Sequence, residues 1–135
     1  MATIYKEIHL KADPQAVWDA IRDFGSVHTR LARDFVTHTT REDGVRTVTF
    51  ANGVVARERL VGTDDRTRRL AYTVLDGAAA HHNASFQVFD APDGGTRLVW
   101  ITDVLPDDVR AVIAPMVDEG SKAIQRTLEQ AADRD

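Results

Sequence analysis

The stretch that decides the fold lies near the C-terminus and reads VRAVIAPMVDEGSKAIQRTL, residues 109–128. Its apolar residues recur at intervals of three and four, so they share one face of an α-helix. The stripe consists of Val109, Val112, Ile113, Met116, Val117, Gly120, Ile124, Thr127 and Leu128. Pro115 interrupts it and predicts a kink or a short lead-in helix, because proline removes one backbone hydrogen bond. Such a helix needs a large apolar surface to pack against.

Residues 34–106 supply that surface, because their pattern is that of β-strands throughout. Strands are predicted at residues 35–40, 46–50, 54–61, 69–75, 83–89 and 96–105, with one more at residues 3–10. Asn52-Gly53 is the strongest hairpin signal, and it predicts a type I′ turn with positive φ at both residues. The sequence therefore predicts seven strands.

Two short helices are predicted after the first strand. Asp13 can cap a helix that begins with Pro14, and residues 26–32 predict a second short helix or a turn. The order of elements predicts an α+β fold, in which a curved antiparallel sheet of seven strands wraps around the long C-terminal helix. One helix cannot cover so wide a sheet, so we expect a cavity between them, where a ligand would bind.

The composition excludes several classes of function. The 135 residues amount to one domain, which we expect to span residues 1–135. A net charge of −4, with no basic cluster backed by aromatics, argues against nucleic-acid binding. The absence of cysteine excludes disulfides, thiolate catalysis and cysteine-bound metals. There is no phosphate loop, dinucleotide fingerprint or G-x-S-x-G motif, so no cofactor is predicted.

The location is predicted from what the chain lacks. No apolar run approaches the roughly 18 residues of a membrane span, so we expect no membrane insertion. The N-terminus has no signal-peptide core, so we expect a cytoplasmic protein. A monomer and a homodimer both fit the sequence.

Several pieces carry a family resemblance by their order and spacing along nearly the whole chain. They are Ala12-Asp13-Pro14 through Val17-Trp18, with Ile21 and Asp23-Phe24-Gly25; Asn52-Gly53; Arg57-Glu58-Arg59-Leu60 with Asp64-Asp65; Tyr72-Thr73-Val74-Leu75-Asp76-Gly77; and the Pro92 hairpin that leads to Trp100. Together they resemble the polyketide cyclase/dehydrase-like branch of the START-like, or helix-grip, superfamily. One departure is Arg30-Leu31-Ala32, where many relatives carry Trp-x-Pro.

The resemblance implies a ligand-binding domain that holds a small hydrophobic or aromatic, polyketide-like molecule. The superfamily includes aromatase/cyclases, lipid carriers and plant hormone receptors, and fold alone does not choose among them. An enzyme would cyclise or dehydrate the ligand by acid/base catalysis without a metal. The alternative is a non-catalytic carrier or sensor of a lipid or another hydrophobic metabolite. A partner-binding domain without a ligand is a third interpretation.

Glu58 is the first catalytic candidate. Strand alternation places it on one face with Ala56 and Leu60. In the hormone receptors that this stretch resembles, the matching glutamate faces the pocket, where a carboxylate would bind a ligand hydroxyl or act as an acid or base. The alternative is a surface residue paired with one of the arginines Arg46, Arg57 and Arg59.

Tyr72 and His82 complete the catalytic candidates. Tyr72 shares a face with Val74, and its hydroxyl needs a partner if buried, so it is a possible proton donor. By resemblance, residues 76–80 and the Asn52-Gly53 turn rim the pocket mouth, so His82 is predicted to touch ligand; the alternative is a solvated histidine. His81 and His82 point to opposite faces, and no converging ligands are spaced for a metal, so no metal site is predicted.

The remaining candidates form the wall of the expected pocket. Arg33 precedes Phe35 on the same face by alternation and resembles a pocket lysine of the hormone receptors. An inward arginine would bind a ligand carboxylate or enolate, or pair with Glu58; the alternative is a surface arginine. Trp100 and Thr102 are assigned to the inner face of their strand; the alternative is that Val99, Ile101 and Asp103 face inward. The other predicted wall residues, for which close packing is the alternative, are Ala56, Leu60, Val74, Phe86, Val112, Met116 and Gly120.

Overall fold

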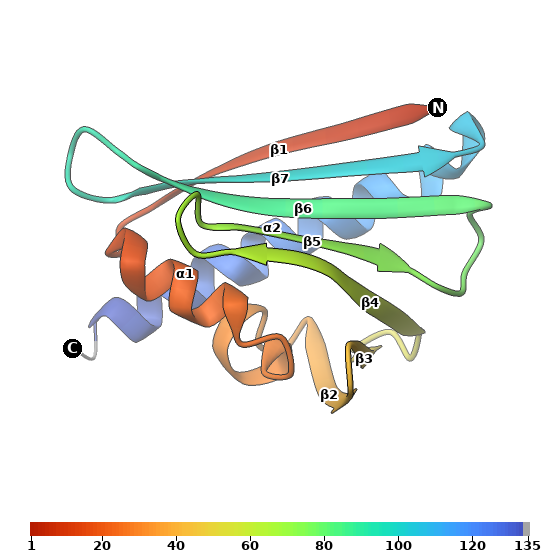
Figure 1. The fold of residues 1–135 in the computed structure, drawn as a ribbon, viewed down its shortest axis with the longest axis horizontal. Helices are drawn as coiled ribbons and strands as arrows, with labels where there is room; N and C mark the ends of the chain where they lie inside the picture. Colours follow the sequence, from red (N-terminus) through yellow and green to blue (C-terminus); the bar gives the residue numbers. More distant parts are fainter. Residues whose placement is uncertain (134–135) are drawn as a thin grey trace.

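Seven strands form one antiparallel sheet in the order β1-β7-β6-β5-β4-β3-β2, in a computed structural model that describes residues 1–133 (Figure 1). The strands are β1 (Ala2–Leu10), β2 (Val36–Glu42), β3 (Val45–Phe50), β4 (Val55–Asp64), β5 (Arg69–Val74), β6 (His81–Asp90) and β7 (Thr96–Leu105). Spatial neighbours are consecutive in sequence except β1, which pairs with β7. The predicted sheet of seven strands is confirmed.

The described part of the chain also contains four helical segments: α1 (Pro14–Arg22), the π-helix η1 (Val27–Leu31), the 3-10 helix η2 (Asp107–Val109) and α2 (Arg110–Asp133). Figure 1 shows α2 running across one face of the curved sheet, from the end of β7 to the C-terminus. The Asp13 carboxylate caps α1 by accepting a hydrogen bond from the Ala16 amide at 3.1 Å. The fold is the predicted α+β arrangement of a sheet around a long helix.

Two local predictions need correction. The Asn52-Gly53 hairpin is not a type I′ turn, because only Gly53 has a positive φ, of 89°. The Phe50 amide bonds the Val54 carbonyl, so the loop has three residues, a form in which one glycine takes the left-handed conformation. Pro115 does not interrupt α2; the lead-in helix η2 ends at Val109, and α2 continues through Pro115.

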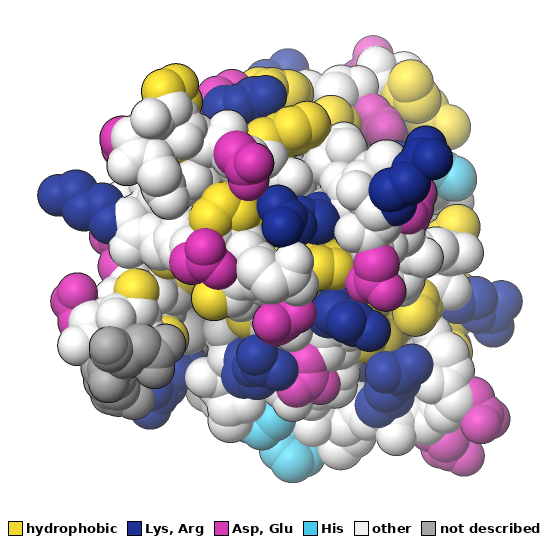
Figure 2. Space-filling model, turned by 60° about the vertical axis from the view of Figure 1, so that its left-hand side comes forward, with side chains coloured by type: hydrophobic (Ala, Val, Ile, Leu, Met, Phe, Trp, Pro, Cys, Tyr) yellow, Lys and Arg dark blue, Asp and Glu magenta, His cyan; other side chains and the backbone are white. Residues whose placement is uncertain are grey.

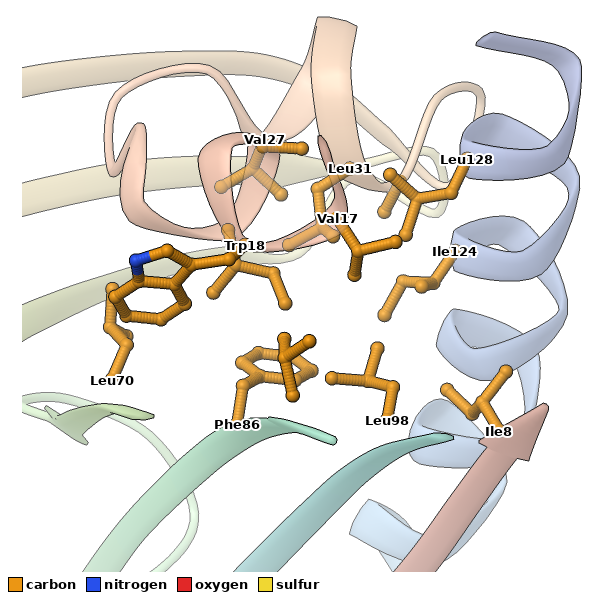
Figure 3. Packing of buried hydrophobic residues seen from close by; sticks show 14 of the residues in the cluster. Ile8, Val17, Trp18, Val27, Leu31, Leu70, Phe86, Leu98, Ile124 and Leu128 are labelled. Atoms are coloured by element: carbon orange, nitrogen blue, oxygen red, sulfur yellow. The ribbon is translucent and has the colours of Figure 1, made fainter. Parts of the chain in front are cut away.

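The core fills one end of the space between the sheet and α2. There α1 packs on β6 and β7, and η1 contacts both α1 and α2. Figure 3 shows side chains from these helices and from the strands meeting in one cluster. Trp18, Ile21, Leu70 and Leu98 are each no more than 1% exposed. We call this region, where α1 and η1 form an additional layer, the filled end.

One face of the surface carries charges of both signs in close alternation. In Figure 2, lysine and arginine side chains lie beside aspartate and glutamate, and apolar side chains form only small separate areas between them. No large single-sign patch covers this face. Among residues 1–133, no helix is both long and apolar enough to cross a membrane.

Candidate functional site

A pocket of about 360 Å³ lies between the sheet and the N-terminal half of α2. It begins beside η1, where Val27 and Leu31 form part of its wall, and extends along α2 to Val112. Its walls are mainly aliphatic and aromatic. This is the position in which the sequence predicts a cavity, and the volume is in the range of small-molecule sites.

All but two of the predicted site residues line this pocket. They come from the segment before β2, from strands β4 to β7 and from α2. The lining includes Phe35, Ala56, Glu58, Tyr72, Val74, His82, Phe86, Trp100, Thr102, Val112, Met116 and Gly120. Their positions are therefore as expected, while their roles in binding or catalysis remain predictions.

The prediction that Arg33 faces the pocket is wrong. Its side chain is exposed and does not belong to the lining. The cause is Asp34, whose φ of 71° turns the chain before β2 begins, so strand alternation does not extend from Phe35 back to Arg33. The backbone of Arg33 is held instead by α2, since its amide donates to the Thr127 hydroxyl at 2.9 Å.

Leu60 also lies outside the pocket. It points inward as alternation predicts, directly opposite Tyr72 of β5, but it is half-buried against the core cluster. The pocket reaches Ala56 and Glu58 and stops before Leu60. The face was predicted correctly, while the length of the wall along β4 was overestimated.

Arg46 is the functional residue that the candidate list missed. Its Nε donates to Glu58 Oε1 at 2.8 Å, and its guanidinium lies 4.0 Å from the centre of the Phe24 ring. Both charged residues are buried, at 4% and 8% exposure, and both line the pocket. Glu58 is thus an inward carboxylate with an arginine partner, a combination of the two interpretations that the sequence leaves open.

The three-residue hairpin loop decides which arginine faces Glu58. In the observed register Arg46 lies directly opposite Glu58 on neighbouring strands. A two-residue turn at Asn52-Gly53 would shift the pairing by one position and place Arg46 opposite Arg59 instead. The signal for this pair was in the sequence, but the register that selects it depends on the loop.

Tyr72 is buried with its ring against Phe86, at a centroid distance of 6.3 Å. Burial raises the pKa of its hydroxyl well above the usual range, the negative charge of Glu58 adds to this, and the positive charge of Arg46 opposes it. The hydroxyl therefore stays protonated at neutral pH and is a hydrogen-bond donor in the pocket wall.

His82 is half-buried in the pocket wall, on the strand that begins at His81. Burial lowers the pKa of its imidazole below 6.5, and the neighbouring charge of His81 lowers it further. The ring is therefore neutral at pH 7. His81 itself is exposed and bonds to the Asn83 side chain at 2.7 Å, so the two rings do point apart.

The mouth of the pocket has an apolar rim. Val54, Val55 and Val112 line the pocket and are 47%, 56% and 57% exposed. Residues 76–79 form another side of the mouth, as the resemblance implied. Arg57 Nε holds this loop by donating to Asp76 Oδ2 at 2.6 Å. Asn52 and Gly53 do not line the pocket, although their neighbours Phe50 and Val54 do.

A family model described as polyketide cyclase / dehydrase and lipid transport matches residues 1–134. The chain belongs to this family. Family membership and the fold together indicate binding of a hydrophobic ligand. A comparison with curated proteins gives no match.

Solved structures show the same START-like fold. The protein XoxI from Bacillus cereus has a TM-score of 0.82 at 21% identity, over 95% of this chain and 96% of that one. A protein from Thermobifida fusca has a TM-score of 0.79 at 25% identity, over 99% and 95% of the two chains. A START superfamily protein from Mycobacterium smegmatis has a TM-score of 0.76 at 13% identity, over 96% and 98%.

The polar groups of this pocket can form hydrogen bonds and transfer protons. Tyr72 offers a protonated hydroxyl, His82 a neutral imidazole, and Arg46 and Glu58 a paired charge, all on one pocket. Among residues 1–133, no group of three histidine, aspartate or glutamate side chains is arranged to hold a metal ion.

Proposed function

We propose that this protein binds a small, largely apolar or aromatic ligand, polyketide-like in class, in the pocket between the sheet and α2. The observation that carries the proposal is the space of about 360 Å³ beneath apolar side chains, beside an end of the same layer that is fully packed. Water in such a space makes few hydrogen bonds, so an apolar ligand that displaces it is favoured by about 25 cal/mol per Å² of buried surface.

The polar groups favour binding over chemistry as the principal function. The Arg46 guanidinium and the Glu58 carboxylate are paired at 2.8 Å, so together they add no net charge to the pocket wall that would attract an ionised ligand group. A ligand without a full charge fits this wall best. A carrier or sensor of a hydrophobic metabolite requires nothing more.

Catalysis is a second candidate, supported by one observation. Glu58, Tyr72 and His82 line the same pocket, as an acid/base mechanism for cyclisation or dehydration requires. Tyr72 would donate a proton to a ligand oxygen, and His82 would accept one. The engagement of Glu58 by Arg46 leaves Tyr72 and His82 as the principal pair.

The binding proposal is tested with an uncharged fluorescent probe, N-phenyl-1-naphthylamine, titrated into the full chain. Met116→Trp places a large ring in the pocket and should lower the affinity at least tenfold. Ala111→Trp is the matched control, because Ala111 lies on the exposed side of the same helix and should leave the affinity unchanged. Equal affinities for the two variants would contradict binding in this pocket.

Native mass spectrometry of freshly purified protein would identify a natural ligand, and the same compound then tests catalysis. If this protein is an enzyme, incubating the compound with it should yield a product lighter by one water (dehydration) or an isomer of equal mass (cyclisation). Tyr72→Phe should keep the affinity and lower the rate by at least about a hundredfold, the usual contribution of one acid/base group. Unchanged ligand after prolonged incubation would contradict catalysis, and only the carrier or sensor function would then stand.

A further inference from the structure

Within residues 1–133, two polar atoms in the pocket wall have no hydrogen-bond partner. They are the Thr102 hydroxyl oxygen Oγ1 and the Trp100 indole nitrogen Nε1, and both are shielded from the surrounding solvent. Thr102 is 1% exposed as a whole residue. Buried polar groups in folded proteins nearly always have a partner, because leaving one unpaired is costly. The two atoms lie on the same strand, two residues apart, and both residues line the pocket.

The surrounding protein offers Thr102 no alternative partner. Its neighbours across the inner face are apolar, since it pairs with Ala84 of β6 and with Ile4 of β1. The backbone groups of these strands are engaged in the sheet. Thr102 lines the pocket, so an occupant of the pocket is the candidate partner for the hydroxyl.

Packing fixes the indole ring of Trp100. One face lies against Phe86, at a centroid distance of 4.8 Å and an interplanar angle of 23°. The six-membered ring lies against Gly120 of α2, where a Cβ atom would be only 3.1 Å from Trp100 Cη2. The ring cannot turn its N–H group elsewhere without losing these contacts. The N–H lies near the Tyr72 hydroxyl, whose pKa it lowers, but within the described residues it has no partner in good hydrogen-bond geometry.

We propose that the pocket recognises a hydrogen-bond-accepting oxygen of its ligand, as in an aromatic ketone, through the Thr102 hydroxyl and the Trp100 N–H. The inference rests on the proposed function and adds the chemical class of the ligand. An indole N–H is a donor only, so the matching ligand atom is an acceptor. The self-paired Arg46 and Glu58 make an uncharged oxygen the better match.

Other buried hydroxyls of the chain serve as comparisons for Thr102. Thr127 Oγ1 donates to the Ala123 carbonyl at 2.7 Å, and Thr96 Oγ1 donates to the Ala12 carbonyl at 2.8 Å. Thr39 resembles Thr102, because it is buried at 7% exposure and its hydroxyl lacks a partner, but it lies outside the pocket. Thr39 therefore provides a matched control for an unpaired hydroxyl that no ligand can reach.

The test compares two compounds of the same shape, 1-tetralone, which has a carbonyl group, and tetralin, which has a methylene group instead. The native chain should bind 1-tetralone about tenfold more tightly, the worth of one hydrogen bond. Thr102→Val should bring the two affinities close together, whereas Thr39→Val should preserve the preference. Both changes replace an unpaired hydroxyl by a methyl group of equal size, so neither variant should melt at a lower temperature than the native chain.

The Trp100 arm of the test uses nuclear magnetic resonance. The chain has two tryptophans, and Trp18 Nε1 already donates to Asp65 Oδ1 at 2.8 Å, so its indole proton serves as an internal reference. The Trp100 indole proton should shift downfield with 1-tetralone and much less with tetralin. Assignment follows from the signal that disappears in Trp100→Phe.

Each of the following results would overturn the inference in whole or in part. Equal affinity for the two compounds, or a preference that survives Thr102→Val, would mean that the hydroxyl does not contact the ligand, and the binding proposal would stand alone. If the Trp100 indole signal does not shift upon saturation with 1-tetralone, the indole N–H does not bond to the ligand. If neither compound binds while N-phenyl-1-naphthylamine does, the ketone class is wrong; if none of the three binds, the proposed function fails as well.

Discussion

The two ends of the space between the sheet and α2 are built from the same elements but packed differently. At the filled end, α1 and η1 add side chains such as Trp18 and Ile21, and the residues are almost completely buried. At the other end, α2 alone faces the sheet, Val112 is 57% exposed, and a pocket of about 360 Å³ remains. A helix and a sheet in contact therefore do not close a core by themselves, and the additional layer decides where the space is filled.

The first way to break this comparison is to remove equal side chains from each end. Ile21→Ala on α1 should destabilise the protein by about 4 kcal/mol, because a buried isoleucine leaves a cavity in close packing. Ile113→Ala on α2 should cost about 1 kcal/mol or less, because Ile113 is half-buried beside existing space. Urea denaturation measures both. Similar losses would mean that the pocket end is as tightly packed as the filled end.

At the pocket end, substitution of Glu58 should nevertheless destabilise the protein strongly. Glu58→Gln leaves the Arg46 charge buried without its counter-ion and should cost about 3 kcal/mol. Asp76→Asn removes the acid of the exposed Arg57–Asp76 pair, whose atoms approach to 2.6 Å, and should leave the urea midpoint within error. The two pairs start from adjacent residues of β4, so only burial distinguishes them. Equal effects would contradict the buried position of Glu58.

His82 sharpens the comparison through pH. Its pKa in the folded protein is lowered, mainly by burial, so the unfolded chain binds the proton more tightly. Stability should be highest above pH 6.5 and should fall as the pH drops from 6.5 through the lower folded value. His82→Gln should remove this part of the pH dependence, measured as unfolding free energy between pH 7.5 and pH 5. His81→Gln removes only the smaller cause of the lowered pKa of His82, the charge of His81, so it should reduce the pH dependence of stability without abolishing it. If His82→Gln has the same pH dependence as the native chain, His82 is solvated rather than buried.

Gly120 marks the boundary between the two ends and should show the smallest effect. Alanine favours a helix by about 1 kcal/mol over glycine. The added Cβ would lie 3.1 Å from Trp100 and 3.3 Å from Phe35, so each ring edge would have to shift by only a few tenths of an ångström, which keeps the contacts of both rings. We expect Gly120→Ala to change the unfolding free energy by about 0.5 kcal/mol or less. A loss well above about 1 kcal/mol would show that the rings are held in place, as at the filled end.

The fold was largely predictable because its signals are periodic. Alternation over β4 placed Ala56 and Glu58 inward, and the spacing of residues 109–128 defined most of α2. The site was predictable only as far as alternation held. It failed at Arg33, where a positive φ at Asp34 lies outside any strand pattern.

Contacts between strands were harder to predict than faces. The Arg46–Glu58 pair depends on the register between β3 and β4, which changes by one position when the hairpin loop has three residues rather than two. The Asn52-Gly53 motif alone does not distinguish these two loop lengths. The unpaired atoms of Trp100 and Thr102 had no signal in the sequence at all. A missing partner is a property of the surroundings in three dimensions rather than of the residue itself.

The pairing of β1 with β7 has a consequence for biosynthesis. Figure 1 shows β1 beside β7. Thr3 of β1 pairs with Asp103 of β7, and the Thr3 hydroxyl donates to Asp103 Oδ1 although 100 positions separate the two residues. At a synthesis rate of roughly 5–20 residues per second, β1 leaves the ribosome about 5–20 seconds before its partner strand exists. Throughout that interval the inward side chains Ile4, Ile8 and Leu10 have no β7 to pair beside. β1 is therefore made before the rest of the sheet and can join it only after β7 has been made.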